Sequence, residues 1–589
     1  MCGIVGHIDL ITTPSKAEIE AACTALRHRG PDGYGIEAVT NNLIFGHTRL
    51  SFLDLGDQGR QPMFSADRTI SITFNGEIYN YLELKKELED DYTFSTTTDT
   101  EVLLAAYRRW GMKMLDRLEG MFAFALHDKI QEKLFLVRDF FGIKPLYYYS
   151  SGKNLIFGSE LKALHCFSAF QKNLDWTSFC DYFVYRYVPS PKTIWENTYK
   201  VPPASYLEIQ TKTLEKKLHT YWQPQFAEKK NKDGELISFV GEKLNSSVQK
   251  HARADVEVGS FLSGGYDSSA IVNYLVKANY FPKTFSIGFS NWQKSEDYFA
   301  KIVAKHLNIS NDTVVADESS LDNIELMPQV YDEPIADISI IPTYLVSQLA
   351  SKKLKAVMSG EGADELFGGY HWQKEFYELH NPKKRLDQIK SFFSKKDTLA
   401  FYVRSMSMGN FDEVELKKML HPNLHQFIPK DVHWFYKKHF RKDLSPLKSI
   451  QYLDMKCFMG ELVLTKVDRA SMANSLEVRV PFLNKVLFEK IFASKEKDYY
   501  KSVETKHLLY QNIKADLPTE ILDRNKQGFV GPDSYYMNKN WYRKQLKNST
   551  LVKNNIINQP YIDDLLSRDY DWRIWKILVM EKWFATWGE

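Results

Sequence analysis

Short apolar runs separated by polar turns dominate the first 210 residues, and their enrichment in Ile, Phe, Val and Tyr is typical of strands. The predicted strands span residues 3–10, 42–52, 69–74, 121–127, 133–138 and 154–158. Helices are predicted at 16–27, 82–88 and 100–110, with Asp99 at the N-cap of the third. This mixture predicts a layered α+β fold with largely antiparallel strands.

From about residue 236 the pattern changes to strands that alternate with helices. Strands are predicted at 256–262, 284–289, 312–316 and 356–359, with helices at 269–278 and 296–307. Such alternation predicts a parallel sheet covered by helices on both faces. Beyond about residue 370 the chain is predicted to be mostly helical. The polar stretch 228–235 is interpreted as part of a linker, or equally as a solvated helix end.

Composition narrows the class of protein. A chain of 589 residues is expected to form two or more domains. The 77 basic and 74 acidic residues nearly cancel, so we expect no nucleic-acid partner. The five cysteines are scattered without a CxxC pair, which favours a reducing cytoplasm. We expect no signal peptide and no membrane span, because no suitable apolar stretch is present.

Cys2 is the first candidate catalytic residue. Removal of Met1 would give this residue both a thiol and a free α-amine. The thiolate is a nucleophile, and an amine with an ordinary pKa near ~8 can act as its base. The alternative interpretation is an ordinary cysteine that happens to follow the initiator.

A glycine-rich loop at 263–269 (Ser-Gly-Gly-Tyr-Asp-Ser-Ser) lies between a predicted strand and a predicted helix. Its two glycines bring backbone N–H groups close to a ligand, and the helix N-terminus favours an anion. The loop therefore predicts a phosphate site, in which Asp267 would need a bridging cation such as Mg²⁺. It lacks the GxxxxGK[ST] pattern. The alternative is a Gly-Gly turn with a Ser/Asp helix cap.

A second acidic loop at 359–369 follows another predicted strand. In a parallel sheet the carboxyl ends of strands share one edge, where ligands bind. Asp267 and Asp364 are therefore predicted to face one Mg²⁺–pyrophosphate unit, with Glu361 near the reacting centre. An acidic cap on a surface helix is the competing interpretation.

These features together resemble the glutamine-dependent asparagine synthetase family over nearly the whole chain. The resemblance rests on Cys2 and on the strings at 27–32, 46–51, 74–80, 98–101, 263–269, 332–337, 359–369, 464–469, 478–483 and 505–508. It implies a class II glutamine amidotransferase domain (1–210) with an N-terminal nucleophile αββα sandwich. A linker (211–235) and an ATP-pyrophosphatase-type synthetase domain (236–589) follow.

The resemblance also implies roles for residues of the first domain. Cys2 attacks the side-chain carbonyl of glutamine, while Asn75 and the N–H of Gly76 form the oxyanion hole. Arg49 pairs with the substrate α-carboxylate, and Glu77 and Asp99 hold its α-ammonium. The implied glutamine-binding residues are Arg49, Leu50, Ser51, Phe52, Leu53, Asn75, Gly76, Glu77 and Asp99. Taken singly, Arg49 and Asp99 would more often be ordinary surface charges.

For the second domain the resemblance implies ATP as a substrate and Mg²⁺ held by Asp267 and Asp364. Glu361 and Lys506 are the implied catalytic residues, although a surface lysine is the alternative for Lys506. The implied ATP-binding residues are Leu262, Ser263, Gly264, Gly265, Asp267, Ser268, Ile287, Ser359 and Gly360. An internal path for ammonia and a homodimer are further expectations from the resemblance.

The implied reaction is amidation of aspartate through an acyl-adenylate, giving asparagine, glutamate, AMP and pyrophosphate. The identity of the carboxylate that is amidated stays open, because Tyr266 and residues 338–342 depart from the family pattern. The alternative is the same chemistry on another carboxylate, such as a uronic acid of a surface polysaccharide. A sugar-phosphate aminotransferase would not need the loop at 263–269. A degenerate binding protein would have lost Cys2, Asn75 and Lys506.

Overall fold

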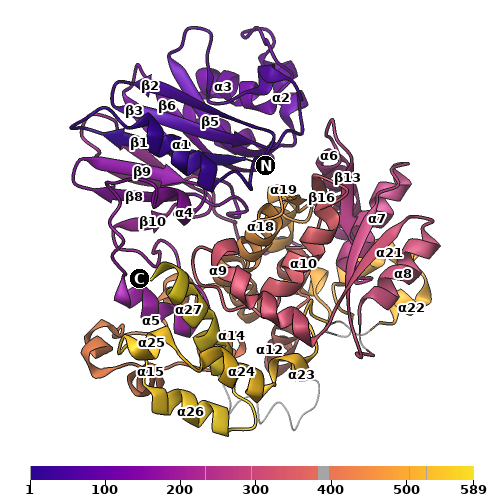
Figure 1. Cartoon of the computed structure of the whole chain (residues 1–589). Helices are drawn as coiled ribbons and strands as arrows, with labels where there is room; N and C mark the ends of the chain where they lie inside the picture. Colours follow the sequence, from indigo (N-terminus) through magenta and orange to yellow (C-terminus); the bar gives the residue numbers. More distant parts are fainter. Residues whose placement is uncertain are drawn as a thin grey trace.

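The computed structural model describes residues 2–232, 234–293, 295–381, 397–502, 504–524 and 527–588 (Figure 1). The first part of the chain forms two six-stranded antiparallel sheets. In sheet order, the first contains β10 (Thr198–Lys200), β8 (Tyr147–Ser151), β9 (Asn154–Gly158), β1 (Gly3–Asp9), β3 (Leu43–Arg49) and β2 (Gly33–Thr40). The second contains β12 (Lys216–Thr220), β11 (Ser205–Gln210), β7 (Lys133–Arg138), β6 (Gly120–Asp128), β5 (Ile70–Ile78) and β4 (Met63–Phe64).

The two sheets face each other across an apolar core that includes Ile4 and Phe45 of the first sheet and Leu136 of the second. The outer faces carry helices. Because successive side chains of a strand alternate, Val5 packs on the opposite face with Ile19 of α1. The helices of this part are α1 (Lys16–Ala25), α2 (Tyr81–Leu88), α3 (Asp99–Trp110), α4 (Leu161–Leu164) and α5 (Trp176–Tyr185). The predicted αββα sandwich is confirmed.

Several element boundaries differ from the sequence predictions. The N-cap of α3 is Thr98, whose side chain accepts from the N–H of Glu101, so Asp99 lies one position inside the helix. β5 continues to Ile78 and places Asn75 within a strand. The segment predicted as a linker contains β12, which pairs with β11. We therefore propose that the first domain ends after Thr220.

The second part contains a five-stranded sheet in the order β15, β14, β13, β16, β17, with every pair parallel as predicted. Its strands are β15 (Asn311–Ala316), β14 (Thr284–Phe289), β13 (Val258–Phe261), β16 (Ala356–Met358) and β17 (Glu477–Arg479). The helices around it are α6 (Glu235–His251), α7 (Tyr266–Lys277), α8 (Asp297–His306), α9 (Met327–Val330), α10 (Ile340–Ser351) and α11 (Ala363–Phe367). Helix α7 starts three residues before its predicted beginning, so Asp267 and Ser268 lie in its first turn.

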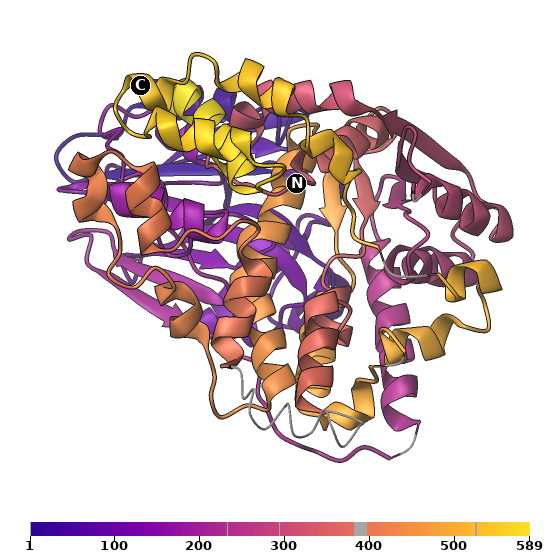
Figure 2. The same cartoon turned by 90° about the horizontal axis from the view of Figure 1, so that it is seen from below.

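The remainder is mostly helical, as predicted (Figure 2). It comprises α12 (His371–His380), α14 (Thr398–Met406), α15 (Glu413–Met419), α16 (Trp434–His439), α17 (Pro446–Leu453), the π-helix η5 (Asp454–Val463), α18 (Leu464–Met472), α19 (Lys485–Phe492), α20 (Glu496–Tyr499), α21 (His507–Ile513), α22 (Thr519–Leu522), α23 (Asp533–Tyr536), α24 (Lys539–Leu546), α25 (Thr550–Lys553), α26 (Gln559–Ser567) and α27 (Arg573–Trp587). Helix α27 lies beside α5 (Figure 1), where the hydroxyl of Tyr182 donates to the carbonyl of Lys576.

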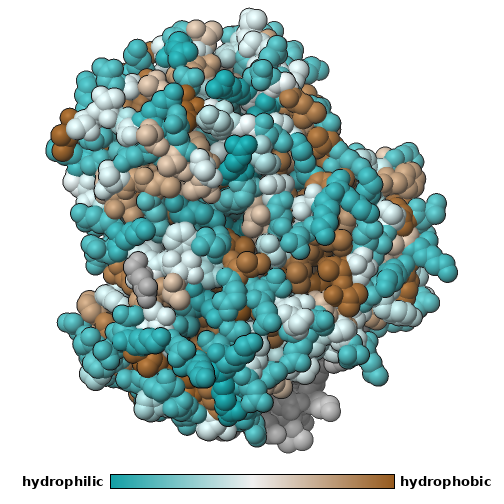
Figure 3. Space-filling model, viewed as in Figure 1, coloured by the Kyte–Doolittle hydropathy of each residue, from teal (hydrophilic) through white to brown (hydrophobic). Residues whose placement is uncertain are grey.

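The face shown in Figure 3 is mainly hydrophilic, with smaller apolar patches between polar side chains. Within the described residues, every helix is either too short or too polar to cross a membrane.

Candidate functional site

Cys2 lies just before β1 and is buried, with 8% of its surface exposed. Its backbone N–H donates to Oδ1 of Asn75 over 3.1 Å, and its carbonyl accepts from Nε of Arg29 over 3.1 Å. Burial raises the pKa of the Cys2 thiol, while a hydrogen bond from the backbone of Leu50 and the charge of Arg49 act in the opposite direction. The structure thus brings the predicted nucleophile together with Asn75, which lies on another sheet.

The side-chain amide of Asn75 has an unused hydrogen-bond donor. Its Nδ2 is fully buried and has no partner among the described residues, although its Oδ1 is occupied by Cys2. Gly76 follows on β5, where a Cβ atom would lie 2.2 Å from the carbonyl oxygen of Met121, so only glycine fits. An unsatisfied buried amide is costly unless a ligand uses it. A free donor next to a cysteine suits a developing oxyanion.

Arg49 ends β3 and organises the loop that follows it. Its guanidinium donates to the carbonyls of Leu53, Asp54 and Gly56. The same loop is held from the other side, because the N–H of Ser51 donates to Asp32 over 2.8 Å. Arg49 therefore shapes the segment that contains Leu50, Ser51, Phe52 and Leu53. Contact with a substrate carboxylate would require its guanidinium to leave some of these carbonyls.

The two predicted ammonium ligands, Glu77 and Asp99, lie near each other and are both buried. Burial raises the pKa of Asp99 to about 6, although its carboxylate accepts from the N–H of Ile78 over 2.9 Å. Burial also raises the pKa of Glu77, and Arg479 of β17 opposes this shift. Arg479 belongs to the second domain, and its Nη2 lies 3.5 Å from Oε2 of Glu77. The sequence did not indicate this contact.

The glycine-rich loop connects β13 to α7 as predicted. Gly264 adopts a φ of +71°, and a Cβ atom there would lie 2.5 Å from Cβ of Phe299. Oγ of Ser263 accepts from the N–H of Gly265 over 3.2 Å, and Oγ of Ser268 accepts from the N–H of Ser263 over 3.1 Å. Tyr266, which departs from the family pattern, donates its hydroxyl to the carbonyl of Leu522. These contacts hold the loop in one conformation, and they occupy the N–H groups of Ser263 and Gly265.

The second acidic loop approaches the first. A Cβ atom on Gly360 would lie 2.7 Å from Cβ of Asp267. The ammonium of Lys506 forms ion pairs with the carboxylates of Asp267 and Asp364, and its Nζ lies 2.8 Å from Oδ1 of Asp364. Its ammonium therefore lies where both side chains converge. Two carboxylates that share one cation fit a Mg²⁺ that would complete its shell with phosphate oxygens and water.

Other predicted nucleotide residues lie in or next to the strands of the parallel sheet. Leu262 and Ile287 are buried on or beside the central strands. The N–H of Ser359 donates to the carbonyl of Arg479 over 2.8 Å. One carboxylate oxygen of Glu361, Oε2, is buried without a partner among the described residues. An unpartnered buried oxygen beside the two loops fits a group that contacts substrate.

A buried ionic network that sequence reasoning missed joins the two domains. Nη1 of Arg29 donates to Glu160 over 2.7 Å and to Asp468 of α18 over 2.8 Å. Arg469 pairs with Glu160 over 2.9 Å and with Asp332 over 3.1 Å. Arg29 and Asp468 both lie in strings that carry the family resemblance. Only their spacing of 439 positions hid the pairing.

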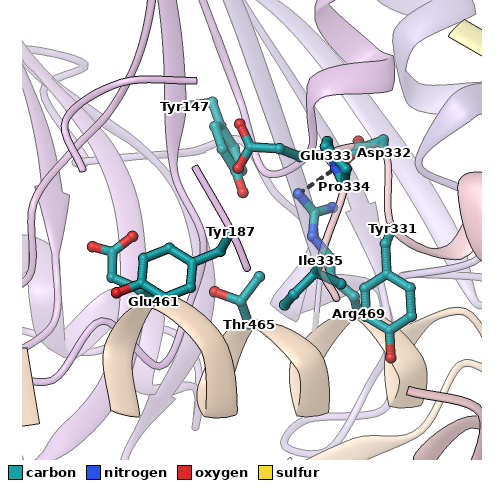
Figure 4. A pocket seen from close by; sticks show the side chains of 10 residues that line it. All are labelled: Tyr147, Tyr187, Tyr331, Asp332, Glu333, Pro334, Ile335, Glu461, Thr465 and Arg469. Atoms are coloured by element: carbon teal, nitrogen blue, oxygen red, sulfur yellow. Dashed lines mark ion pairs between the residues drawn. The ribbon is translucent and has the colours of Figure 1, made fainter. Parts of the chain in front are cut away.

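Figure 4 shows a small cavity at this junction. Tyr147 and Tyr187 line it from the first domain, and Thr465 and Arg469 line it from α18. Its volume of about 10 Å³ has room for roughly one water molecule, whereas small-molecule sites occupy hundreds of Å³. None of the residues that line the cavity is a predicted nucleotide-binding residue.

The chain matches two family models, the glutamine amidotransferase domain over residues 1–222 and asparagine synthase over residues 240–585. It is 35% identical to asparagine synthetase [glutamine-hydrolyzing] 1 of Bacillus subtilis, over 99% of this chain and 96% of that protein. A putative asparagine synthetase of Mycobacterium tuberculosis is 30% identical over 100% of this chain and 98% of its own length.

A protein of Gibberella zeae named amidase chry2 is 27% identical, over 94% of this chain and 90% of its own length. The family model for the second domain covers more than half of the chain, and the relatives align from end to end. The chain therefore belongs to the glutamine-hydrolysing asparagine synthetase family and is a glutamine-dependent carbon–nitrogen ligase.

Proposed function

We propose that this enzyme amidates aspartate at the expense of ATP, with glutamine as the nitrogen source. The observation that carries the proposal is the presence of two separate polar centres in one chain. Cys2 and the free amide of Asn75 form the first, and Lys506 with Asp267 and Asp364 forms the second. Relatives named asparagine synthetase support the same overall reaction.

At the first centre, removal of Met1 frees the α-amine of Cys2. The thiol proton passes to this amine, and the thiolate attacks the side-chain carbonyl carbon of glutamine. The negative charge that develops on oxygen is stabilised by Nδ2 of Asn75 and the N–H of Gly76. Collapse of the intermediate expels ammonia and leaves a thioester on sulfur. Water then releases glutamate and regenerates the thiol.

At the second centre, the β-carboxylate of aspartate attacks the α-phosphorus of ATP and pyrophosphate leaves. Lys506 balances charge on the phosphates, and the loop at 263–269 donates N–H groups to them. Asp267 and Asp364 would hold Mg²⁺, which supplies additional charge neutralisation when bound. Ammonia then attacks the acyl carbon, AMP leaves, and asparagine forms.

A second candidate is the same chemistry on a different carboxylate. The relative named amidase chry2 favours it, as do residues 338–342, which depart from the pattern of dedicated aspartate enzymes.

Product identification separates these candidates. The purified chain is incubated with ATP, Mg²⁺, glutamine and one carboxylate at a time, and the products are identified by mass spectrometry. With aspartate we expect equal amounts of asparagine, glutamate, AMP and pyrophosphate. Release of AMP with another acid, and none with aspartate, would establish the second candidate. No AMP with any acid would contradict both.

A further inference from the structure

A mixed-charge cluster lies at the edge of the parallel sheet that carries the nucleotide loops. Asp337 and Ser339 immediately precede α10, and Lys466 lies in the first turn of α18. Each of these helices leads directly into a strand, α10 into β16 and α18 into β17. Their N-termini therefore lie at the carboxyl ends of the strands, the edge where ligands bind in such sheets.

The cluster is tied together by short contacts. Nζ of Lys466 donates to Oγ of Ser339 over 2.6 Å and lies 3.6 Å from Oδ1 of Asp337. Burial acts to raise the pKa of Asp337, but the charges of Lys466 and Arg186 together with hydrogen bonds from Ser339 lower the pKa below its ordinary value. Asp337 is therefore an ionised carboxylate with two cations nearby.

Arg186 reaches this cluster from the first half of the chain. It ends α5 in a left-handed conformation with a φ of +73°, and its carbonyl accepts from the N–H of Ala336 over 2.8 Å. This backbone contact places Arg186 next to Asp337. The guanidinium lies 5.7 Å from the ring centre of Phe458.

The charge of Arg186 is incompletely satisfied. The residue is 9% exposed, and its Nε is buried without a hydrogen-bond partner among the described residues. Its Nη1 donates to the sulfur of Met408 over 3.6 Å. No carboxylate among the described residues forms an ion pair with it. By contrast, the neighbouring buried cations Lys200 and Arg469 pair with Glu333 and Asp332. Because an unpaired buried cation is costly, Arg186 is suited to an anionic ligand.

Aromatic contacts connect this cluster to the nucleotide loops. The ring of Phe458 packs edge-on against Tyr370 with centres 5.6 Å apart. The hydroxyl of Tyr370 donates to Glu365 over 2.7 Å, and Glu365 follows Asp364, the predicted Mg²⁺ ligand. The cluster and the phosphate-binding loops are therefore linked by a continuous line of contacts.

We propose that Arg186 and Lys466 bind the α-carboxylate of the acceptor and that Asp337 binds its α-ammonium. The acceptor is then an α-amino acid whose side-chain carboxylate faces ATP, as in aspartate. This assignment rests on the proposed ligase function and identifies the residues that select the acceptor. Arg186 and Asp337 act on binding and take no part in the chemical step.

The test measures pyrophosphate release with saturating ATP and with ammonium chloride as the nitrogen source, so the glutamine site is bypassed. Arg186→Met and Lys466→Met should each raise the KM for aspartate about ten-fold or more, since a charge-assisted hydrogen bond is lost, with little change in kcat. Arg404→Met, on the exposed side of α14, is the matched control and should leave the KM unchanged.

Two analogues separate the two ends of the acceptor. β-Alanine lacks the α-carboxylate and succinate lacks the α-amine, and both are measured as competitive inhibitors against aspartate. Arg186→Met should leave inhibition by β-alanine unchanged. Asp337→Asn should raise the KM for aspartate about ten-fold or more but leave inhibition by succinate unchanged.

Glutamine hydrolysis without ATP reports on folding of each variant. If Arg186→Met loses this activity, the KM values for aspartate of Lys466→Met and of the conservative variant Arg186→Lys test the assignment instead. Unchanged KM values in variants of a wild type that uses aspartate would overturn this inference and leave the proposed function intact. A wild type that releases no pyrophosphate with aspartate would overturn the proposed function, and the acceptor assignment with it.

Discussion

Nη2 of Arg479 lies 3.5 Å from Oε2 of Glu77, and this contact joins the synthetase sheet to the glutaminase site. The same guanidinium pairs with Glu477 and donates to the carbonyls of His251 and Arg253. The carbonyl of Arg479 accepts from Ser359 of the acidic loop. One buried residue therefore contacts elements of both centres.

Replacing this arginine should destabilise the protein. Arg479→Gln would leave two buried carboxylates without their cation, which typically costs about 3–5 kcal/mol of the free energy of unfolding. Arg441→Gln is the control, because it breaks an exposed pair with Asp443 and should cost about 0–1 kcal/mol. Thermal and chemical denaturation measure both variants. Equal stabilities of the two would show that the buried contact contributes little.

Cys2→Ala should abolish glutamine hydrolysis and leave ammonia-dependent synthesis intact, because the two centres use different residues. Cys23→Ala, which removes another buried thiol of the same domain, should retain both activities. Glutamate and AMP are assayed with each nitrogen source. Simultaneous loss of both activities in a folded Cys2→Ala protein would refute the assignment of two separate sites.

Asn75→Ala should lower kcat for glutamine hydrolysis by about 10²–10³-fold, since an oxyanion donor is removed. The buried Asn80 provides the comparison, because its side chain only bridges backbone groups of Arg117 and Glu119. Asn80→Ala should leave kcat nearly unchanged. Steady-state glutamate release distinguishes them, and similar rates in both variants would argue against an oxyanion role.

Protonation of Asp99 should control glutamine use at low pH. Burial raises the pKa of this carboxyl to about 6, and only the ionised form can pair with an ammonium group. We expect kcat/KM for glutamine to fall as the pH drops through about 6. Asp99→Asn should hydrolyse glutamine slowly and show no fall of kcat/KM near pH 6. Asp67→Asn, which changes an exposed residue, should keep this pH dependence. An identical inflection in Asp99→Asn would assign the titration to another group.

The same shift has a consequence for stability. Because the pKa of folded Asp99 lies above its ordinary value of 3.8, the folded protein holds the extra proton between pH 3.8 and about 6. The contribution of this group to stability therefore declines as the pH rises through that interval. Denaturation midpoints of wild type and Asp99→Asn should diverge across it.

Lys506→Met should reduce ATP-dependent pyrophosphate release by about 10²-fold or more, because a cation at the phosphates is lost. It should also increase the affinity of the nucleotide-free protein for Mg²⁺, since Asp267 and Asp364 then lack their shared ammonium. Calorimetric titration with MgCl₂ measures this second effect. The exposed Lys514→Met is the control. Equal Mg²⁺ affinities of the two variants would show that Asp267 and Asp364 do not form the Mg²⁺ site.

Sequence patterns predicted the elements that depend on local chemistry. The short run containing Ile4, Val5 and Ile8 predicted β1, because β-branched residues favour strands. The two glycines before α7 identified the turn, and the resemblance linked Asn75 and Lys506 to their proposed roles. The N-cap of α3 was misplaced by one residue, because Thr98 and Asp99 can each cap a helix. The three-residue strand β17 is too short to form a pattern.

By itself, the sequence predicted many of the strands and helices, and through the family resemblance it proposed which short strings carry the chemistry. The tertiary structure alone decided which distant charges meet: Arg29 with Asp468, Arg479 with Glu77, and Arg186 beside Asp337. The physical reason is that periodicity records which face of an element is buried and not what that face contacts. A buried cation is stabilised by any carboxylate within a few ångströms, and only the packed fold specifies which one that is.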